Sequence, residues 1–293
     1  MKFFHIADTH LGAIPDAGFA WSEERRSEIW ESFRSVVAKA DREEVDLLLI
    51  AGDLFHRQPL MRELKEVNYL FSTLKKTKVV FIIGNHDYLK VDSYYLDFPW
   101  SENVTCLRGK ECESVVFEDL DTEVYGLSYH TREIKEPKYN DLQPEKKAGF
   151  SILLGHGGDA KHIPIDRKKL LLSGFDYIAL GHIHRPEMIE PDRMAYAGAL
   201  EPIDQNDIGP HGFIEGEYNE GKLSISFVPW ACESISHLSW IRKNVRPTWH
   251  FRRQCGCGWQ QRECSIFIKC FCRDIVIRIL YTIWMPAGSL EIS

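Results

Sequence analysis

The sequence lacks a long apolar run. A membrane-spanning helix takes roughly 20 consecutive apolar residues, and the best candidate among the 293 residues, 275–285, is short and carries Arg278. A signal-peptide pattern is also missing, because Met1 and Lys2 lead directly into a strand-like segment that ends in a charge at Asp8. These absences predict a cytoplasmic protein with no membrane partner.

An excess of positive charge is missing as well. The chain has 36 Lys and Arg against 43 Asp and Glu, a formal net charge of −7, whereas nucleic-acid-binding domains commonly carry a strongly basic surface. A polyanion would therefore have to be bound by a local group of residues. With 44% apolar and 12% aromatic residues, the chain can form a full core, which excludes a disordered or low-complexity protein.

Cysteine is scarce in most of the chain and abundant at its end. Cys106 and Cys112 precede residue 231, whereas the remaining residues contain Cys232, Cys255, Cys257, Cys264, Cys270 and Cys272. The charge balance changes at the same place, from 39 acidic and 27 basic residues in 1–230 to 4 acidic and 9 basic residues in 231–293. We expect a catalytic domain at 1–230 and an atypical Cys- and Trp-rich tail at 231–293.

Three interpretations of this tail stay open. Its thiols and His250 could form a zinc module, but the Cys-x-Cys pairs at 255–257 and 270–272 differ from the usual zinc-binding spacing. A disulfide-bonded tail conflicts with the expected compartment. An out-of-frame or disordered segment explains the joint rise of Cys, Trp and Arg, and we favour that interpretation.

The first 230 residues alternate short apolar runs with helical patterns, which predicts an α/β fold. We expect strands at residues 3–7, 45–51, 78–83, 151–154, 177–180, 193–197, 212–218 and 223–228, and helices around 29–40 and 64–74. Helical patterns are missing between the last of these strands, so part of the sheet system should be antiparallel.

Polar side chains follow five of the expected strands. The segments are D-T-H at 8–10, G-D-L-F-H at 52–56, G-N-H-D at 84–87, G-H at 155–156 and G-H-I-H at 181–184. Any one of them could be only a turn, because Asn, Gly and Asp are turn formers. Five in succession, each at a strand end, favour one shared site, because functional sites of open α/β sheets lie at the carboxyl ends of the strands.

These segments supply carboxylate, carboxamide and imidazole groups suited to Mn, Fe or Zn. The candidate metal ligands are Asp8, His10, Asp53, Asn85, His156, His182 and His184. A carboxylate in the middle of the set can bridge two cations, which makes Asp53 the expected shared ligand. Two metal ions about 3.5 to 4 Å apart serve both the attacking and the leaving oxygen in a displacement at phosphorus.

The five segments resemble the calcineurin-like metallophosphoesterase superfamily, whose pattern is D-x-H, G-D, G-N-H-[DE], G-H and G-H-x-H. The resemblance implies a four-layer α/β/β/α sandwich with two mixed sheets. It further implies that one metal takes Asp8, His10, Asp53 and His184, and that the other takes Asp53, Asn85, His156 and His182.

Longer strings, H-I-A-D-T-H-L-G, A-G-D-L-F-H and Y-A-G-A-L-E-P, are similar to those of the SbcD-type DNA repair exonucleases. This resemblance covers about residues 1–230 and implies a Mn-dependent phosphodiesterase that degrades DNA ends together with an ABC-type ATPase of the SbcC class. A homodimer is a further expectation. The resemblance fades after residue 229, so the capping domain of the family is expected to be missing.

Two histidines outside the ligand set are the candidate catalytic residues. His86 directly follows a ligand, so its protonated imidazole can stabilise the transition state and protonate the leaving oxygen; Asp87 either holds it or forms a turn. By resemblance, His56 is a second phosphate-side imidazole, while Arg57 and Arg185 are candidate DNA-backbone contacts. Two rival functions stay open: a small-molecule phosphodiesterase or phosphatase, and a catalytically poor docking subunit of an ATPase.

Overall fold

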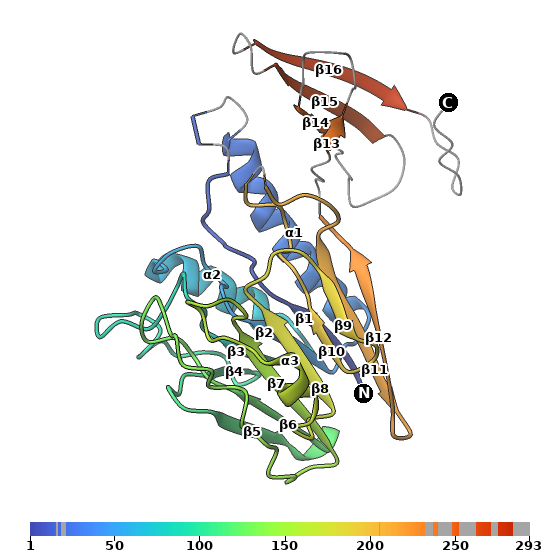
Figure 1. Ribbon diagram of the computed structural model, residues 1–293. Coiled ribbons are helices and arrows are strands. Elements are labelled where there is room, and N and C mark those ends of the chain that lie inside the picture. The colour runs from blue at the N-terminus through green and yellow to red at the C-terminus, as the bar shows by residue number, and fades with distance from the viewer. Residues whose placement is uncertain are drawn as a thin grey trace.

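The computed structural model describes residues 1–15, 17–18, 22–204 and 206–231, followed by the backbone of four strands between residues 237 and 283. Within this described part, the strands form two six-stranded sheets and one four-stranded sheet (Figure 1). Each segment that the sequence assigns to the candidate site lies at the carboxyl end of a strand of the two larger sheets. None of the described helices has both the length and the apolar composition needed to cross a bilayer.

The first sheet has the strand order β12-β11-β1-β2-β3-β4. Its strands are β1 (Lys2–Ile6), β2 (Leu47–Ala51), β3 (Lys78–Ile82), β4 (Val104–Leu107), β11 (Gly212–Asn219) and β12 (Lys222–Pro229). Strands β1 to β4 are parallel, and β11 and β12 extend the sheet in antiparallel pairing. Glu220 and Gly221, both with positive φ, join β11 to β12 in a tight hairpin.

The second sheet has the strand order β5-β6-β7-β8-β10-β9. Its strands are β5 (Glu113–Phe117), β6 (Thr122–Gly126), β7 (Phe150–His156), β8 (Tyr177–Gly181), β9 (Glu187–Glu190) and β10 (Met194–Tyr196). The four central strands are parallel, and β5 and β9 pair antiparallel at the two edges. Both large sheets are therefore mixed, as expected.

Apolar side chains hold four layers together. Leu49 and Val80 of the first sheet belong to the same buried cluster as Ile152 and Ala179 of the second, so the two sheets pack face to face. Helices α1 (Ser22–Arg42) and α2 (Met61–Ser72) cover the outer face of the first sheet. The outer face of the second sheet packs against α3 (Arg167–Leu171) and irregular segments. The expected α/β/β/α architecture is confirmed (Figure 1).

The sequence patterns missed β4, β5, β6 and β9, the short helix α3 and the one-turn 3-10 helix η1 (Glu118–Leu120). Strands β5 and β9 lie at sheet edges, where one row of side chains is solvated, so polar residues interrupt the apolar run. The other expected strands and both expected helices are present, with ends shifted by a few residues. Their position at the sheet edges thus explains why the sequence patterns did not detect β5 and β9.

The tail contains strands that the sequence patterns did not indicate. These are β13 (His237–Ser239), β14 (Thr248–Phe251), β15 (Arg262–Cys270) and β16 (Ile275–Ile283), paired antiparallel in that order. The Cys-x-Cys pair at 255–257 and Cys272 lie outside the described residues. The domain boundary at 230 and the three interpretations of the tail therefore stay predictions.

We predict that a chain ending after Ala231 folds as well as the full chain. Trp230 is retained, and its indole N–H donates to Ser35 Oγ at 2.9 Å while its ring packs 5.6 Å from that of Phe213. The melting temperature, measured by calorimetry, should change by no more than a few degrees, because 1 kcal/mol moves a domain of this size by about 2 to 4 °C. A fall of more than about 10 °C would show that residues 232–293 stabilise the first domain.

Candidate metal centre

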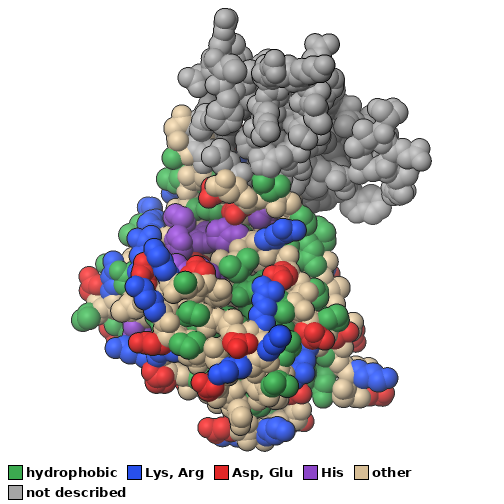
Figure 2. All heavy atoms as spheres, viewed as in Figure 1, with side chains coloured by type: hydrophobic (Ala, Val, Ile, Leu, Met, Phe, Trp, Pro, Cys, Tyr) green, Lys and Arg blue, Asp and Glu red, His purple; other side chains and the backbone are tan. Residues whose placement is uncertain are grey.

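The candidate site lies where strands of both large sheets end. The loops after β1, β2 and β3 of the first sheet meet the last residue of β7 and the loop after β8 of the second. They bring together all seven expected ligands: Asp8, His10, Asp53, Asn85, His156, His182 and His184. On the surface, histidine side chains gather in one patch flanked by Lys and Arg (Figure 2).

Four of these residues have an unusual backbone conformation. The φ angles of Asp8, His10, Asp53 and His182 are 48°, 45°, 48° and 92°, a region that side chains other than glycine rarely adopt and that concentrates at functional sites. Backbone hydrogen bonds fix the first two loops to each other, from Asp8 N to Gly52 O at 3.2 Å and from His10 N to Asp53 O at 3.0 Å. The turns that direct the ligands inward are therefore tied together in pairs.

Two glycines allow the loops to approach this closely. A Cβ atom at Gly52, whose φ is +86°, would overlap the imidazole of His156. A Cβ atom at Gly84 would overlap the carboxylate of Asp53. The glycine at the start of each of these two ligand loops leaves the space for a side chain from another loop.

One group of ligands surrounds the side-chain oxygen of Asn85. This oxygen lies 2.9 Å from Nε2 of His156 and 3.1 Å from Nδ1 of His182. His156 donates from Nδ1 to the carbonyl oxygen of Ala51 at 2.9 Å, which directs Nε2 inward, 3.4 Å from Oδ2 of Asp53. Two oxygens and two ring nitrogens thus converge from the carboxyl ends of four strands.

The second group lies on the other side of Asp53. Nε2 of His10 is 3.1 Å from Nε2 of His184 and 3.8 Å from Oδ2 of Asp53. The carboxylate of Asp8 accepts the backbone N–H of His182 at 2.9 Å, and it lies within 4.8 Å of ring nitrogens of His10 and His184 and also of His156. Asp53 is thus common to both groups, and nitrogen and oxygen lone pairs converge on each side of it. This donor set fits two divalent cations.

Protons balance the buried charge when no cation is bound. Burial raises the pKa of Asp8 to about 6. Burial opposes charging of His156, but Asp53 and Asp8 raise its pKa to about 9. Burial likewise opposes charging of His184, but Asp207 and Asp8 raise its pKa to about 9. Two protonated imidazoles therefore stand among the carboxylates at neutral pH, where a cation would displace their protons.

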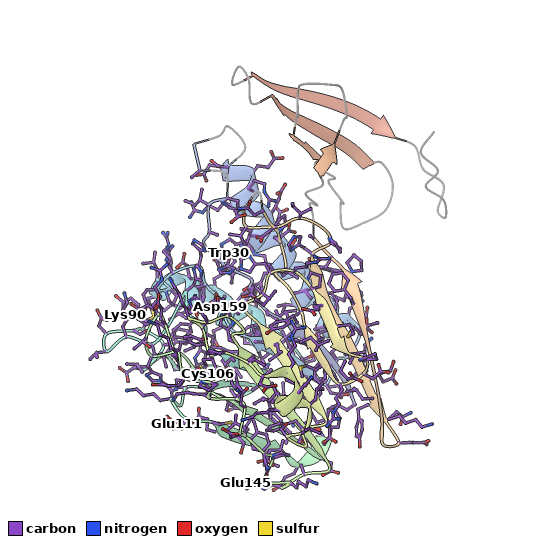
Figure 3. All side chains as sticks on the ribbon, in the orientation of Figure 1. Trp30, Lys90, Cys106, Glu111, Glu145 and Asp159 are labelled. Atoms are coloured by element: carbon purple, nitrogen blue, oxygen red, sulfur yellow. The ribbon has the colours of Figure 1, made fainter. Side chains whose placement is uncertain are left out.

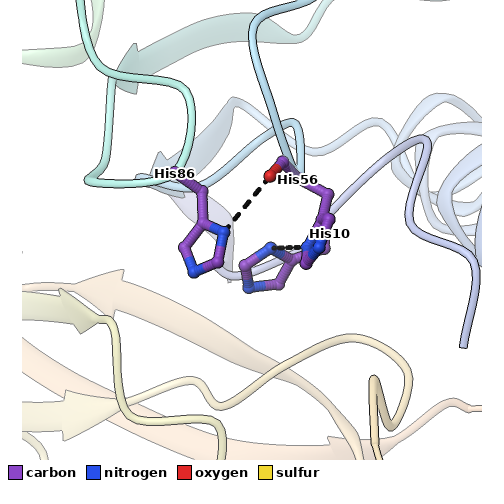
Figure 4. A group of neighbouring side chains, drawn as sticks. All are labelled: His10, His56 and His86. Carbon is purple, nitrogen blue, oxygen red and sulfur yellow. Dashed lines mark hydrogen bonds between the residues drawn. The ribbon is translucent and has the colours of Figure 1, made fainter. Parts of the chain in front are cut away.

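The two candidate catalytic histidines lie beside this cluster (Figure 4). His86 donates from Nδ1 to the carbonyl oxygen of His56 at 3.2 Å, and its backbone N–H donates to Oδ1 of Asp53 at 2.9 Å. Its ring lies 4.7 Å from that of His10 and 5.0 Å from that of His56. These contacts leave Nε2 of His86 as the nitrogen that a substrate can contact.

Of the two roles expected for Asp87, holding the His86 ring or forming a turn, its contacts match the second. Its buried carboxylate accepts the backbone N–H groups of Gly84 and Phe55 at 3.0 and 3.1 Å and the hydroxyl of Tyr95 at 2.7 Å. Burial raises its pKa to about 7. Asp87 therefore fastens the His86 loop to the neighbouring β2 loop, which positions the loop backbone rather than the imidazole.

The candidate DNA contacts differ in their freedom. Arg57 is bound by the carboxylate of Glu63 through two hydrogen bonds of 2.8 and 3.0 Å, so its side chain has a defined orientation. Arg185 follows the ligand His184 directly and is exposed. Both side chains are exposed and stay candidates, and Glu63 holds that of Arg57 in one orientation.

Two carboxylates that contact the ligand histidines were missed. Asp159 accepts a hydrogen bond from Nε2 of His182 at 2.8 Å, and Asp207 accepts one from Nδ1 of His184 at 2.9 Å. Asp159 stands three residues after His156, and a search for acidic residues near the motifs would have found it. Asp207 lies 23 residues beyond His184 in no motif, so its contact depends on the tertiary fold.

Comparisons with known proteins agree with this geometry. Residues 1–186 match the family model described as calcineurin-like phosphoesterase. The chain is 29% identical over 78% of its length to the uncharacterized metallophosphoesterase YhaO of Bacillus subtilis, covering 60% of that protein. It is 31% and 30% identical, over 70% and 84% of its length, to proteins named DNA double-strand break repair protein Mre11 from Archaeoglobus fulgidus and Saccharolobus solfataricus.

The chain spans 51% and 65% of the length of these two Mre11 proteins, so the likeness concerns the part of each relative that aligns with this chain. The family model covers more than half of the chain, including all seven candidate ligands from Asp8 to His184. The chain therefore belongs to the calcineurin-like phosphoesterase family.

Proposed function

We propose that this protein is a dinuclear, Mn-type phosphodiesterase that hydrolyses DNA phosphodiester bonds, as an SbcD-like exonuclease does. The observation that carries the proposal is the convergence of two ligand groups on one buried carboxylate, Asp53. Such a pair of groups suits two divalent ions and a phosphate ester between them. The DNA substrate is supported by the likeness to proteins named for double-strand break repair.

The proposed ligands divide as the geometry groups them. One ion takes Asp8, His10, Asp53 and His184, and the other takes Asp53, Asn85, His156 and His182. When bound, the two ions supply Lewis-acid stabilisation of the charge that develops on the phosphate oxygens. Manganese suits this mixture of carboxylate, amide and imidazole ligands, and iron or zinc are alternatives.

His86 is the proposed proton donor to the leaving oxygen. The hydrogen bond from Nδ1 to the His56 carbonyl oxygen fixes the ring, so a proton on Nε2 is directed away from the protein backbone. A general acid held in this way contributes typically 10²- to 10⁴-fold to the rate. His56, whose ring lies beside that of His86, is the proposed second phosphate-side imidazole.

DNA, an ATPase of the SbcC class and a second copy of the chain are the proposed partners. Arg57 and Arg185 are proposed to contact the DNA backbone beside the metal centre. The excess of 39 acidic over 27 basic residues in 1–230 favours a second candidate function, hydrolysis of a small phosphodiester or phosphomonoester, because duplex DNA is repelled by a net negative domain.

A substrate panel separates the two candidates. The Mn²⁺-loaded full chain is assayed on duplex DNA ends, on single-stranded DNA and on bis-p-nitrophenyl phosphate, with chelated protein as the control. Release of nucleotides from DNA ends at a rate at least equal to that for the small diester supports the nuclease. Hydrolysis of the small diester without any action on DNA at low salt would replace it by the second candidate.

The first prediction for the centre concerns Asp53→Asn. The substitution removes the charge shared by both cations, so bound Mn²⁺ should fall from two ions per chain to at most one, and turnover should fall by several orders of magnitude. Elemental analysis after gel filtration measures the metal content. Asp97→Asn, a change at an exposed carboxylate, is the matched control; two ions retained by Asp53→Asn would contradict the ligand assignment.

The second prediction separates chemistry from metal binding. His86→Ala should keep both ions and lose about two to four orders of magnitude in kcat, because the hydrogen bond of His86 to Asp53 comes from its backbone N–H, while Nδ1 of its ring is bound to the His56 carbonyl oxygen. His130→Ala, a change outside the cluster, should leave kcat unchanged. Loss of a metal ion on His86→Ala would make His86 a ligand.

The third prediction follows from the raised pKa values of His156 and His184, each about 9. At pH 7 both imidazoles carry protons that Mn²⁺ must displace, so loading should release about two protons per chain. The apparent affinity should consequently rise with pH between 7 and 9. Calorimetric titration in buffers of different ionisation enthalpy measures the release; a pH-independent affinity over this range would contradict the prediction.

A further inference from the structure

The two histidines of the 181–184 segment present opposite ring nitrogens to the centre. His182 directs Nδ1 inward, 3.1 Å from the side-chain oxygen of Asn85. His184 directs Nε2 inward, 3.1 Å from Nε2 of His10. A neutral imidazole carries its proton on one nitrogen only, so each inward nitrogen is free to bind a cation only if the outer nitrogen keeps the proton.

Asp159 accepts the outer proton of His182. Its Oδ2 lies 2.8 Å from Nε2 of His182, and the labelled side chain is seen in Figure 3. The carboxylate is held by the backbone N–H groups of Lys161 and His162 at 2.7 and 2.9 Å. It also accepts a hydrogen bond from Nδ1 of His162 at 2.9 Å, and 46% of the side chain is exposed. Asp159 thus serves two imidazoles at the edge of the site.

The loop that carries Asp159 is held in a strained form. Ile163 has a φ of 39°, which is a rare and strained conformation for a β-branched residue. Its N–H donates to the carbonyl oxygen of Ile134 at 2.7 Å, and Gly158 N–H donates to the carbonyl oxygen of His162 at 2.9 Å. The strained turn keeps Asp159 against the ring of His182.

Asp207 accepts the outer proton of His184 in a more enclosed setting. Its carboxylate lies 2.9 Å from Nδ1 of His184 and accepts the N–H of Ile203 at 2.9 Å. His211 donates from Nε2 to the backbone carbonyl oxygen of Asp207 at 3.0 Å. The side chain of Asp207 is 13% exposed, so solvent screens this contact less than the contact of Asp159.

We propose that Asp159 and Asp207 are positioning residues that fix the tautomer and orientation of His182 and His184, and that the metal position beside Asp159 is the weaker of the two. The inference rests on the proposed function, because it concerns the same two cations. It adds an order of binding: the position beside Asp207 fills first, and occupancy beside Asp159 sets how much of the protein carries two ions.

The charges of the proposed ligands favour the same order of metal binding, with the position beside Asp207 filled first. In the proposed ligand sets, the position beside Asp207 takes two carboxylates, Asp8 and the shared Asp53, whereas the position beside Asp159 takes Asp53 and the neutral amide of Asn85. Asp8 also lies within 4.8 Å of His156, so its charge acts on the second position through space rather than as a proposed ligand. An outer carboxylate typically changes metal affinity 10- to 100-fold. A half-exposed carboxylate that is shared with a second imidazole, as Asp159 is, supports its histidine less than the enclosed Asp207.

The test measures Mn²⁺ binding to the metal-free full chain by the electron paramagnetic resonance signal of free Mn²⁺. The wild-type chain should bind two ions with affinities that differ at least tenfold. Asp159→Asn should weaken the second ion about 10- to 100-fold and leave the first ion unchanged, whereas Asp207→Asn should weaken the first. Glu133→Gln is the matched control: it removes a carboxylate that pairs with Lys161 on the neighbouring loop and should leave both ions unchanged.

Combining two substitutions shows whether Asp159 affects metal binding through His182. In a His184→Ala chain, adding Asp159→Asn should still weaken the remaining ion, whereas in a His182→Ala chain it should change nothing, because Asp159 then has no ligand to position. Asp159→Ala, at a half-exposed side chain, is a second variant, and thermal unfolding verifies the fold of each. Equal affinities for the two ions, or an additive effect of Asp159→Asn in the His182→Ala chain, would overturn this inference alone. A wild-type chain that binds fewer than two ions would overturn the proposed function itself.

Discussion

The carboxylate of Asp53 is buried at the point where loops from both large sheets meet, and the arrangement of the centre depends on its negative charge. One oxygen accepts the backbone N–H of His86, and the other faces ring nitrogens of His10 and His156. A buried carboxylate is costly unless positive charge compensates it. In the absence of a cation that charge comes from protonated imidazoles, and the same geometry suits a divalent ion.

The two-sheet sandwich makes this convergence possible. Asp8, Asp53 and Asn85 come from loops of the first sheet, whereas His156 ends strand β7 of the second sheet and His182 and His184 lie in the loop after β8. The central apolar layer holds the sheets at a fixed separation, so ligands from both reach the same few ångströms. The strained backbone at Asp8, His10 and Asp53 is tolerated because this packing and the hydrogen bonds between loops fix the conformation.

The site contains three kinds of contact around the proposed ions. Ligand side chains face inward, His56 and His86 lie on the side proposed for the substrate, and Asp159 and Asp207 hold the outer nitrogens of two ligand histidines. The residues matched by the family model, 1–186, include all seven candidate ligands, both histidines and Asp159, whereas Asp207 lies beyond them. The outer carboxylates come from loops of different exposure, so they can make two chemically similar positions unequal.

The sequence by itself determined the fold class, the family and the set of polar residues at the strand ends, because apolar periodicity and short motifs are local properties of the chain. It left edge strands such as β5 and β9 undetected, because solvated side chains interrupt their apolar pattern. Only the tertiary structure decided that Asp87 fastens a loop and that Asp207 reaches His184 from 23 residues away. The contacts of Asp87 require β2 and β3 to lie side by side in one sheet, and the contact of Asp207 requires a loop that leads into β11 of the first sheet to meet the loop after β8 of the second. Neither arrangement is a local property of the chain.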